Sequence, residues 1–230
     1  MPETLNWFDS MIREGCSGHV VTANAEILYH AYKNPALLSI LNNAALVTAD
    51  GSGVLWAAKY LGHPIPGRVT GVDLLQGLLP LAEKNKWRVF FLGAAPLTLE
   101  EAVLRIRESY PGLNIAGAHH GYFSKDEESA VAEEIRQSQT QILFAGMGFP
   151  RQEEFIAKYL SLLGTTVAMG VGGSFDILAG KTLRAPLWMS DRGLEWLYRL
   201  IREPTRAKRM TALPKFVFEV LKWARNTAKK

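Results

Sequence analysis

The chain has 230 residues, of which 48% are hydrophobic and 21% are charged, a balance typical of a globular protein. This composition excludes a disordered chain, a collagen-like repeat and a coiled coil. The single cysteine, Cys16, excludes a disulfide framework and a cysteine-rich zinc site. No apolar run is long enough to cross a bilayer and no secretory signal is visible at the N-terminus, so we expect a cytoplasmic protein.

Short runs rich in Val, Ile, Leu and Phe alternate with helical patterns along the chain. The runs predict strands at 19–23, 45–49, 87–92, 113–116, 141–145 and 165–169. The patterns between them predict helices near 25–33, 36–43, 52–61, 71–85, 98–109, 126–138 and 151–163. Several strand runs are almost continuously apolar, which indicates strands covered on both faces. The alternation therefore predicts an α/β fold with a mostly parallel sheet and helices on both faces.

The last part of the chain differs from the rest in charge. Residues 199–230 contain ten Lys or Arg and two Glu, a net charge of +8, whereas residues 1–198 have 16 basic and 20 acidic residues, a net charge of −4. We expect a core domain at 1–195 and a basic, amphipathic helical appendage at 196–230. A surplus of positive charge in one segment indicates an anionic partner: a phosphorylated ligand, a lipid surface or nucleic acid.

A helix is predicted over 213–225, because Leu213, Phe216 and Val220 fall on one helical face and Lys222 falls roughly opposite. Such a helix can lie in an anionic membrane surface, or it can pack on the body of the protein with its basic side outward. Both interpretations stay open. A guanidinium cluster just before this helix can bind a diphosphate; its members are Arg199, Arg202, Arg206 and Arg209.

Glycine-rich segments follow three of the predicted strands, at 93–96, 146–150 and 170–176. Ligands of parallel sheets bind at these carboxyl ends, where glycine lets the backbone approach a phosphate closely. The segments therefore indicate a nucleotide or a sugar nucleotide, although glycine also ends strands for turning alone. The full dinucleotide-binding and P-loop patterns are absent.

Asp50 stands between an apolar strand and a Gly-Ser-Gly turn. It is equally well placed to be a general base at the ligand edge or the N-cap of the helix at 52–61. Thr22 can orient a hydroxyl group of a ligand, or it can be a threonine satisfied by the backbone at a strand end. Gln152 can bind sugar hydroxyls, or it can be a solvated residue of a first helical turn.

A metal site is not expected. His119 and His120 have no third ligand at a suitable spacing, and the run at 126–128 is expected to be a solvated helix face. An Asp-x-Asp pair of the kind that holds a divalent ion is absent. Any transfer reaction is therefore expected to proceed without a metal, and we expect no cofactor.

Several strings now coincide in order along the chain: VTADGSGV at 47–54, GRVTGVD at 67–73, HGYF at 120–123, GMGFPRQE at 146–153, GVGGSFD at 170–176, RAP at 184–186 and GLEWLYRL at 193–200. Together they resemble the WecG/TagA/CpsF family of bacterial glycosyltransferases, over residues 22–209. The resemblance implies a Rossmann-like α/β core followed by a C-terminal helical appendage. It also implies inverting transfer of an N-acetylmannosamine-type sugar from a UDP donor to a polyprenyl-diphosphate-linked sugar, without a required metal, in cell-wall, antigen or exopolysaccharide synthesis.

Carried over by motif, the resemblance makes Asp50 the base, with Thr22 and Gln152 as further catalytic residues. The residues expected to bind substrate are Asn24, Arg68, Gly93, Tyr122, Gly146, Gly148, Val171, Gly172, Gly173, Asp176, Arg184, Arg199, Arg206 and Arg209. Among them, the glycine strings, Tyr122 and Asp176 are expected on the nucleotide side, and the appendage arginines on the diphosphate of the acceptor.

The expected mechanism is a single displacement in which Asp50 takes the proton of the attacking sugar hydroxyl. We expect the enzyme to lie on the inner face of the bacterial membrane, in contact with anionic lipid through its C-terminal helix. The oligomeric state stays open between a monomer and a homo-oligomer, in which the apolar face of that helix pairs between subunits when no membrane is present. The alternatives are a nucleic-acid-binding protein and a protein that binds a UDP-sugar without turnover. Nucleic acid is not expected as a partner, because that interpretation leaves the glycine-rich strand ends unused.

Overall fold

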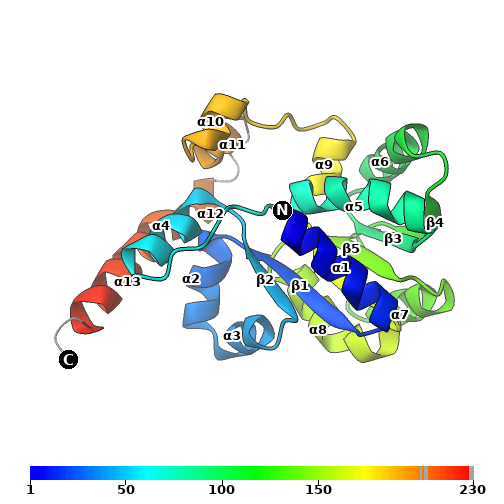
Figure 1. The fold of residues 1–230 in the computed structure, drawn as a ribbon, viewed down its shortest axis with the longest axis horizontal. Helices are drawn as coiled ribbons and strands as arrows, with labels where there is room; N and C mark the ends of the chain where they lie inside the picture. The colour runs from blue at the N-terminus through cyan, green and yellow to red at the C-terminus, as the bar shows by residue number, and fades with distance from the viewer. Residues whose placement is uncertain (203, 205–206, 228–230) are drawn as a thin grey trace.

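The computed structural model describes residues 1–202, 204 and 207–227 (Figure 1). Its centre is a six-stranded sheet in the order β2-β1-β6-β5-β3-β4, with every neighbouring pair parallel. The strands are β1 (Gly18–Ala23), β2 (Leu46–Ala49), β3 (Arg88–Gly93), β4 (Asn114–His119), β5 (Ile142–Gly146) and β6 (Val167–Gly170). All six predicted strands are confirmed, and so is the parallel α/β class.

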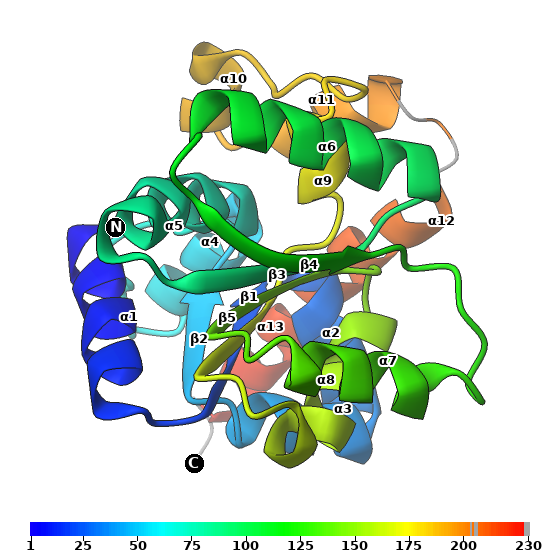
Figure 2. The same ribbon diagram turned by 90° about the vertical axis from the view of Figure 1, so that its right-hand side faces the viewer.

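Helices cover both faces of the sheet (Figure 2). One face carries α1 (Pro2–Glu14), α5 (Gly71–Asn85), α6 (Pro96–Ser109) and α9 (Ser174–Leu178); the other carries α2 (Ala25–Lys33), α3 (Pro35–Asn42), α7 (Glu128–Gln137) and α8 (Arg151–Leu163). Helix α4 (Ser52–Tyr60) follows β2. The seven predicted core helices are confirmed. Helix α1 is absent from the predicted elements, although Leu5, Phe8 and Ile12 follow a helical spacing and the last two are buried.

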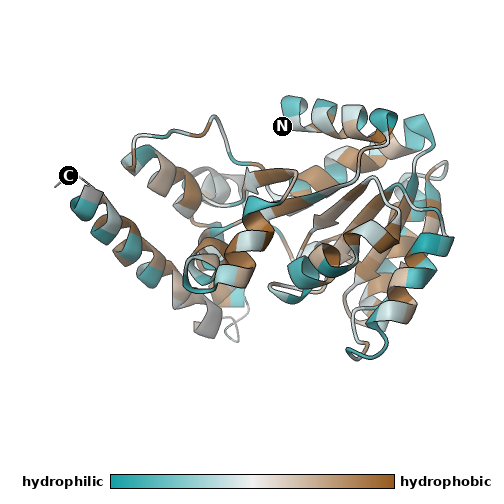
Figure 3. Ribbon diagram, turned by 90° about the horizontal axis from the view of Figure 1, so that it is seen from below, coloured by the Kyte–Doolittle hydropathy of each residue, from teal (hydrophilic) through white to brown (hydrophobic). Residues whose placement is uncertain are grey.

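Successive residues of the central strands serve opposite faces of the sheet. Phe91 of β3 stacks on Phe144 of β5, with ring centroids 5.8 Å apart, in the cluster under α1, α5 and α9. Phe90 belongs to the cluster under α7 and α8, together with Phe155. This burial on both faces explains the continuous apolar runs, and Figure 3 shows the strands as hydrophobic elements between helices with hydrophilic outer sides.

The C-terminal part begins beyond α9 with α10 (Leu187–Asp191), α11 (Glu195–Arg202), α12 (Ala207–Met210) and α13 (Ala212–Thr227). Helix α13 packs on α2 and α4, where Phe216 and Val220 join Ala25 and Ala57 in one buried cluster. Packing of this helix on the body of the protein is therefore confirmed, and contact of its outer, basic side with a membrane stays a prediction. None of the helices in the described part of the chain is both long and apolar enough to span a membrane.

Candidate functional site

All six parallel strands end at the same edge of the sheet. Strands β5 and β3 are neighbours, but the chain continues from β3 to β4 on one side and from β5 to β6 on the other. Where the connections of two adjacent strands diverge in this way, α/β proteins have a crevice that binds ligands. A cleft of about 520 Å³, here called the strand-end cleft, lies there. Its lining residues are Thr22, Asn24, Glu26, Ile27, Asp50, Ala94, Ala95, Gly121, Tyr122, Gly146, Met147, Gly148, Phe149, Arg151, Gln152, Val171, Gly172, Gly173 and Asp176.

The floor of the cleft depends on a close backbone approach between β3 and β5. A Cβ at Gly93, whose φ is +135°, would lie 2.3 Å from the carbonyl oxygen of Gly146. The same oxygen accepts a hydrogen bond from the Ala94 N–H at 2.9 Å. Gly93 is therefore needed for the turn itself, and it lies behind the lining residues rather than among them. The expectation that it binds substrate directly stays a prediction.

Gln152, in the first turn of α8, holds two glycine loops together. Its Oε1 accepts hydrogen bonds from the N–H groups of Gly148 and Gly172, both at 3.1 Å, and its Nε2 donates to Glu153 at 2.8 Å. The side chain is buried. The interpretation of Gln152 as a solvated first-turn residue is therefore wrong, because its amide joins the loops after β5 and β6. Its catalytic role stays a prediction.

Glu153 is a buried carboxyl group that sequence reasoning did not single out. Its side chain is 1% exposed, and burial raises its pKa to about 7, although the hydrogen bond from Gln152 opposes this shift. Its Oε2 is buried without a hydrogen-bond partner in the described part of the chain. A Cβ at Gly170 would lie 2.4 Å from Gln152 Nε2 and 2.8 Å from Glu153 Oε1, so glycine at 170 makes room for this pair.

Asp50 follows β2 and lines the strand-end cleft. Its Oδ2 accepts a hydrogen bond from the backbone N–H of Gly71, the first residue of α5, at 3.2 Å. Helix α4 begins after Gly51 and has no side-chain cap, so the interpretation of Asp50 as the N-cap of that helix is wrong. The carboxylate instead lies at the start of a different helix, at the edge of the cleft.

Thr22 of β1 pairs with Thr48 of β2, two residues before Asp50, and is buried. Its hydroxyl donates to the carbonyl oxygen of Gly170 at 3.2 Å. This bond confirms the interpretation of a strand-end threonine satisfied by the backbone. Because Thr22 also lines the cleft, a role toward a ligand stays a prediction.

A second, smaller cavity of about 140 Å³ lies between the core and the C-terminal helices, and we call it the appendage pocket. Its lining residues are Asn24, Ala25, Glu26, Asp50, Gly51, Ser52, Gly53, Arg68, Gly193, Glu195, Trp196, Met210 and Leu213. Three residues, Asn24, Glu26 and Asp50, line both cavities. Asn24 is also the N-cap of α2, where its side chain accepts a hydrogen bond from Ile27. Asp50 therefore stands in the wall that the two cavities share.

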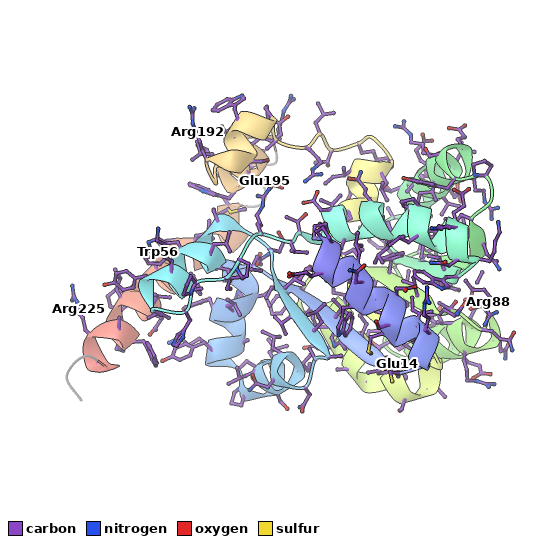
Figure 4. All side chains as sticks on the ribbon, in the orientation of Figure 1. Glu14, Trp56, Arg88, Arg192, Glu195 and Arg225 are labelled. Carbon is purple, nitrogen blue, oxygen red and sulfur yellow. The ribbon has the colours of Figure 1, made fainter. Side chains whose placement is uncertain are left out.

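Polar contacts fasten the first residue of α11 and the turn before it to the rest of the core. Arg68 and Glu195 form an ion pair at 3.0 Å, and the Ser52 hydroxyl donates to the Gly193 carbonyl at 3.0 Å. Figure 4 shows Glu195 on the part of α11 that is nearest the core. Arg68 lines the appendage pocket, and substrate binding by it stays a prediction.

Arg184 forms an ion pair with Asp73 of α5 at 2.6 Å and does not line either cavity. Burial acts to raise the pKa of Asp73, but hydrogen bonds from Arg184 and Thr70 and the charge of Arg184 bring it below its ordinary value. The structure thus gives Arg184 a fastening role, and substrate binding by it stays a prediction.

Of the predicted site residues, the strand-end cleft brings together Thr22, Asn24, Asp50, Tyr122, Gly146, Gly148, Gln152, Val171, Gly172, Gly173 and Asp176. Arg206 lies outside the residues that the structure describes, and so do the side chains of Arg199 and Arg209. Sequence reasoning missed Glu26, Arg151 and Glu195. Arg151 and Glu195 lie inside strings already singled out, and Glu26 lies two residues after Asn24.

Among the described residues, no group of three or more His, Cys, Asp or Glu side chains is arranged to hold a metal ion. His119 lies 3.9 Å from Glu134, and its Nδ1 is within hydrogen-bond distance of the His120 carbonyl.

A parallel sheet with helices on both faces and a polar cleft at its carboxyl edge defines a Rossmann-like α/β protein. The sequence profile of the WecG/TagA/CpsF family of glycosyl transferases matches residues 1–230, and the chain belongs to this family. It is therefore a glycosyltransferase, and the resemblance carried by the motifs is confirmed.

Curated relatives cover most of the chain. A protein of Bacillus spizizenii is 42% identical over 210 residues, 91% of this chain and 81% of the relative. Proteins of Bacillus subtilis and of Staphylococcus aureus strain MW2 are 36% identical, over 90% and 91% of this chain and 80% and 82% of the relatives. All three are named N-acetylglucosaminyldiphosphoundecaprenol N-acetyl-beta-D-mannosaminyltransferase.

Proposed function

We propose that this glycosyltransferase moves an N-acetylmannosamine-type sugar from a UDP donor to a sugar linked to a polyprenyl diphosphate, with inversion and without a required metal. The observation that carries the proposal is the position of Asp50 in the wall between the strand-end cleft and the appendage pocket. A base that must reach an acceptor hydroxyl beside a donor sugar belongs at such a junction.

The strand-end cleft is the proposed donor site. Its volume of about 520 Å³ is in the range of small-molecule sites, and glycine loops after β5 and β6 let the backbone approach a diphosphate. Tyr122, a residue that is 74% exposed, lines this cleft, and its ring offers a flat apolar surface for a base. The names of the relatives, which specify transfer of N-acetylmannosamine, support the sugar class.

The appendage pocket is the proposed entrance of the acceptor. Arg68 lines it, and the arginines of residues 199–209 are close to it in the chain, so cations are available for a diphosphate. Met210, Leu213 and Trp196 provide apolar surface on the same wall. The relatives' names specify N-acetylglucosaminyldiphosphoundecaprenol, which supports a lipid-linked diphosphate as the acceptor class.

In the proposed reaction the acceptor hydroxyl oxygen attacks the anomeric carbon of the donor while Asp50 takes the hydroxyl proton. The new glycosidic bond forms as the bond to UDP breaks, and attack from the side opposite UDP inverts the anomeric centre. UDP departs with the bonding electron pair. Backbone N–H groups and guanidinium groups stabilise its charge. Addition of EDTA is expected to leave the rate unchanged.

The decisive test measures transfer from a panel of UDP-sugars to a short-chain polyprenyl-diphosphate N-acetylglucosamine by mass spectrometry. We expect product with UDP-N-acetylmannosamine. UDP binding without any product from the panel would instead favour a non-catalytic binding protein, and loss of transfer in EDTA with recovery in Mg²⁺ would contradict metal independence.

We also propose that α13 holds the enzyme on the anionic inner leaflet. Lys215, Phe218, Lys222 and Arg225 share a helical stripe roughly opposite Phe216 and Val220, which are buried against the core, and Phe218 is 64% exposed. Figure 4 shows Arg225 on the outer side of this helix. The variant K222Q should weaken binding to phosphatidylglycerol vesicles about fivefold, since one basic residue near an anionic surface contributes about 1 kcal/mol. The control K84Q, on α5, should bind like the wild type; equal binding of both variants would contradict the proposal.

A further inference from the structure

The loop between β4 and α7 carries the most exposed aromatic side chain of the strand-end cleft. Its Tyr122 is 74% exposed, whereas the next residue, Phe123, is buried in the core cluster under α7 and α8. The backbone N–H of Gly121 donates to the Ala94 carbonyl at 2.9 Å, which ties this loop to the one after β3. The loop is thus anchored on both sides of a side chain that reaches into the cleft.

Arg151, the first residue of α8, binds this loop with both arms of its guanidinium group. Its Nη1 donates to the carbonyl oxygen of Gly121 at 2.7 Å, and its Nη2 donates to the carbonyl oxygen of Phe123 at 2.6 Å. The guanidinium carbon also lies 4.5 Å from the centre of the Phe123 ring. The two carbonyl groups belong to the residues immediately before and after Tyr122, so one side chain fixes the backbone on either side of the exposed ring.

We propose that Arg151 is a positioning residue that holds Tyr122 as a preformed stacking surface for the nucleoside base of the donor. The inference rests on the proposed function, in which the strand-end cleft binds a UDP-sugar. An exposed aromatic ring on a rigid backbone loses little conformational entropy when a base stacks on it, and this pre-organisation increases affinity.

The chemistry of the contact requires arginine. A planar fork can donate to two carbonyl groups and stack on an aromatic ring at the same time, whereas a lysine ammonium is a single point charge. Arg151 also directly precedes Gln152, which joins the loops of Gly148 and Gly172. The first turn of α8 therefore positions the cleft walls that follow β4, β5 and β6.

The test is a double-mutant cycle measured by calorimetric titration of UDP into the full-length protein. We expect Y122A and R151M each to weaken UDP binding about tenfold, and the double variant to stay within twofold of Y122A, because Arg151 acts through Tyr122. R151K should lose as much affinity as R151M. The control R136M, which removes an exposed arginine of α7, should bind UDP like the wild type.

Two further measurements separate positioning from direct contact and from general structural damage. Inorganic pyrophosphate has no base, so its affinity should be the same in R151K and the wild type. In the transfer assay R151K should raise the KM for the donor about tenfold with kcat unchanged within twofold.

Additive losses in the cycle, an equal loss of pyrophosphate affinity, or wild-type UDP binding by R151K would overturn the inference. A wild-type protein that binds no UDP at all would contradict the proposed function instead, so the two failures are distinguishable. Circular dichroism of R151K identifies a variant that fails to fold; an unfolded R151K would make Arg151 a residue of the core and would also overturn the positioning role.

Discussion

The strand-end cleft and the appendage pocket share Asp50 but are built in different ways. The cleft is closed by hydrogen bonds within the core: Gln152 joins two glycine loops and Arg151 holds a third. The pocket is assembled from residues far apart in the chain, and the Arg68–Glu195 ion pair spans its wall. The strand-end cleft thus forms with the sheet, whereas the appendage pocket depends on how the C-terminal helices pack on the core.

The largest expected effect comes from the residue that belongs to both cavities. The variant D50N should lower the rate of transfer by a factor of about 10² to 10⁴, the usual contribution of a general base, while UDP affinity stays within twofold of the wild type. The measurement is steady-state transfer together with calorimetric UDP binding. The control D126N alters an exposed carboxylate that lines neither cavity and should keep full activity. Wild-type turnover in D50N would contradict the base assignment.

Glu153 adjoins Gln152 of the strand-end cleft and lines neither cavity. Its buried carboxyl group should make the free energy of unfolding depend on pH. Its pKa is raised from 4.5 to about 7, so the folded state retains a proton that the unfolded state releases. The stabilisation is complete below pH 4.5 and is lost as pH rises through 7, a difference of about 3 kcal/mol.

Urea titrations at pH 5 and pH 8.5 should show a smaller loss of stability in E153Q than in the wild type. Burial lowers the pKa of His19 to about 4, so this residue destabilises the folded state as the pH falls from 6.5 to 4. Because His19 is present in both proteins, its contribution cancels in the difference between them. Identical pH profiles of the two proteins would show that Glu153 keeps an ordinary pKa.

The appendage pocket can be altered alone through its ion pair. The variant R68E places two carboxylates together and removes a cation from the pocket, so we expect the KM for the lipid-linked acceptor to rise about ten- to a hundredfold. UDP affinity should not change. The double swap R68E/E195R restores the ion pair; if it also restores acceptor use, Arg68 fastens the appendage and does not bind the substrate.

The smallest expected effect concerns the geometry of the cleft. The variant Q152M retains the side-chain volume but leaves the N–H groups of Gly148 and Gly172 without their acceptor. UDP affinity should fall about fivefold, and the free energy of unfolding should fall by about 1–3 kcal/mol. Acceptor KM should stay unchanged, and an effect on the acceptor alone would contradict the separation of the two cavities.

The sequence predicts the sheet and the edge that carries the site because strands buried on both faces are continuously apolar and their carboxyl ends must meet. It therefore places Asp50, Thr22 and the glycine loops near one another. It does not predict the contacts of Gln152, Arg151 and Glu195, because these join segments 20 to 127 residues apart whose approach is set by packing. Local patterns also left Asp50 open between two roles; the start of α4 excludes the N-cap role, and the role of general base stays a prediction.

The packing of α13 on α2 has a consequence for how the enzyme tolerates change at its end. Ala25, the residue after Asn24, is buried in the same cluster as Phe216 and Val220. A chain shortened before residue 216 would lose the support behind Asn24, which lines both cavities. The final helix therefore supports the wall that the two cavities share.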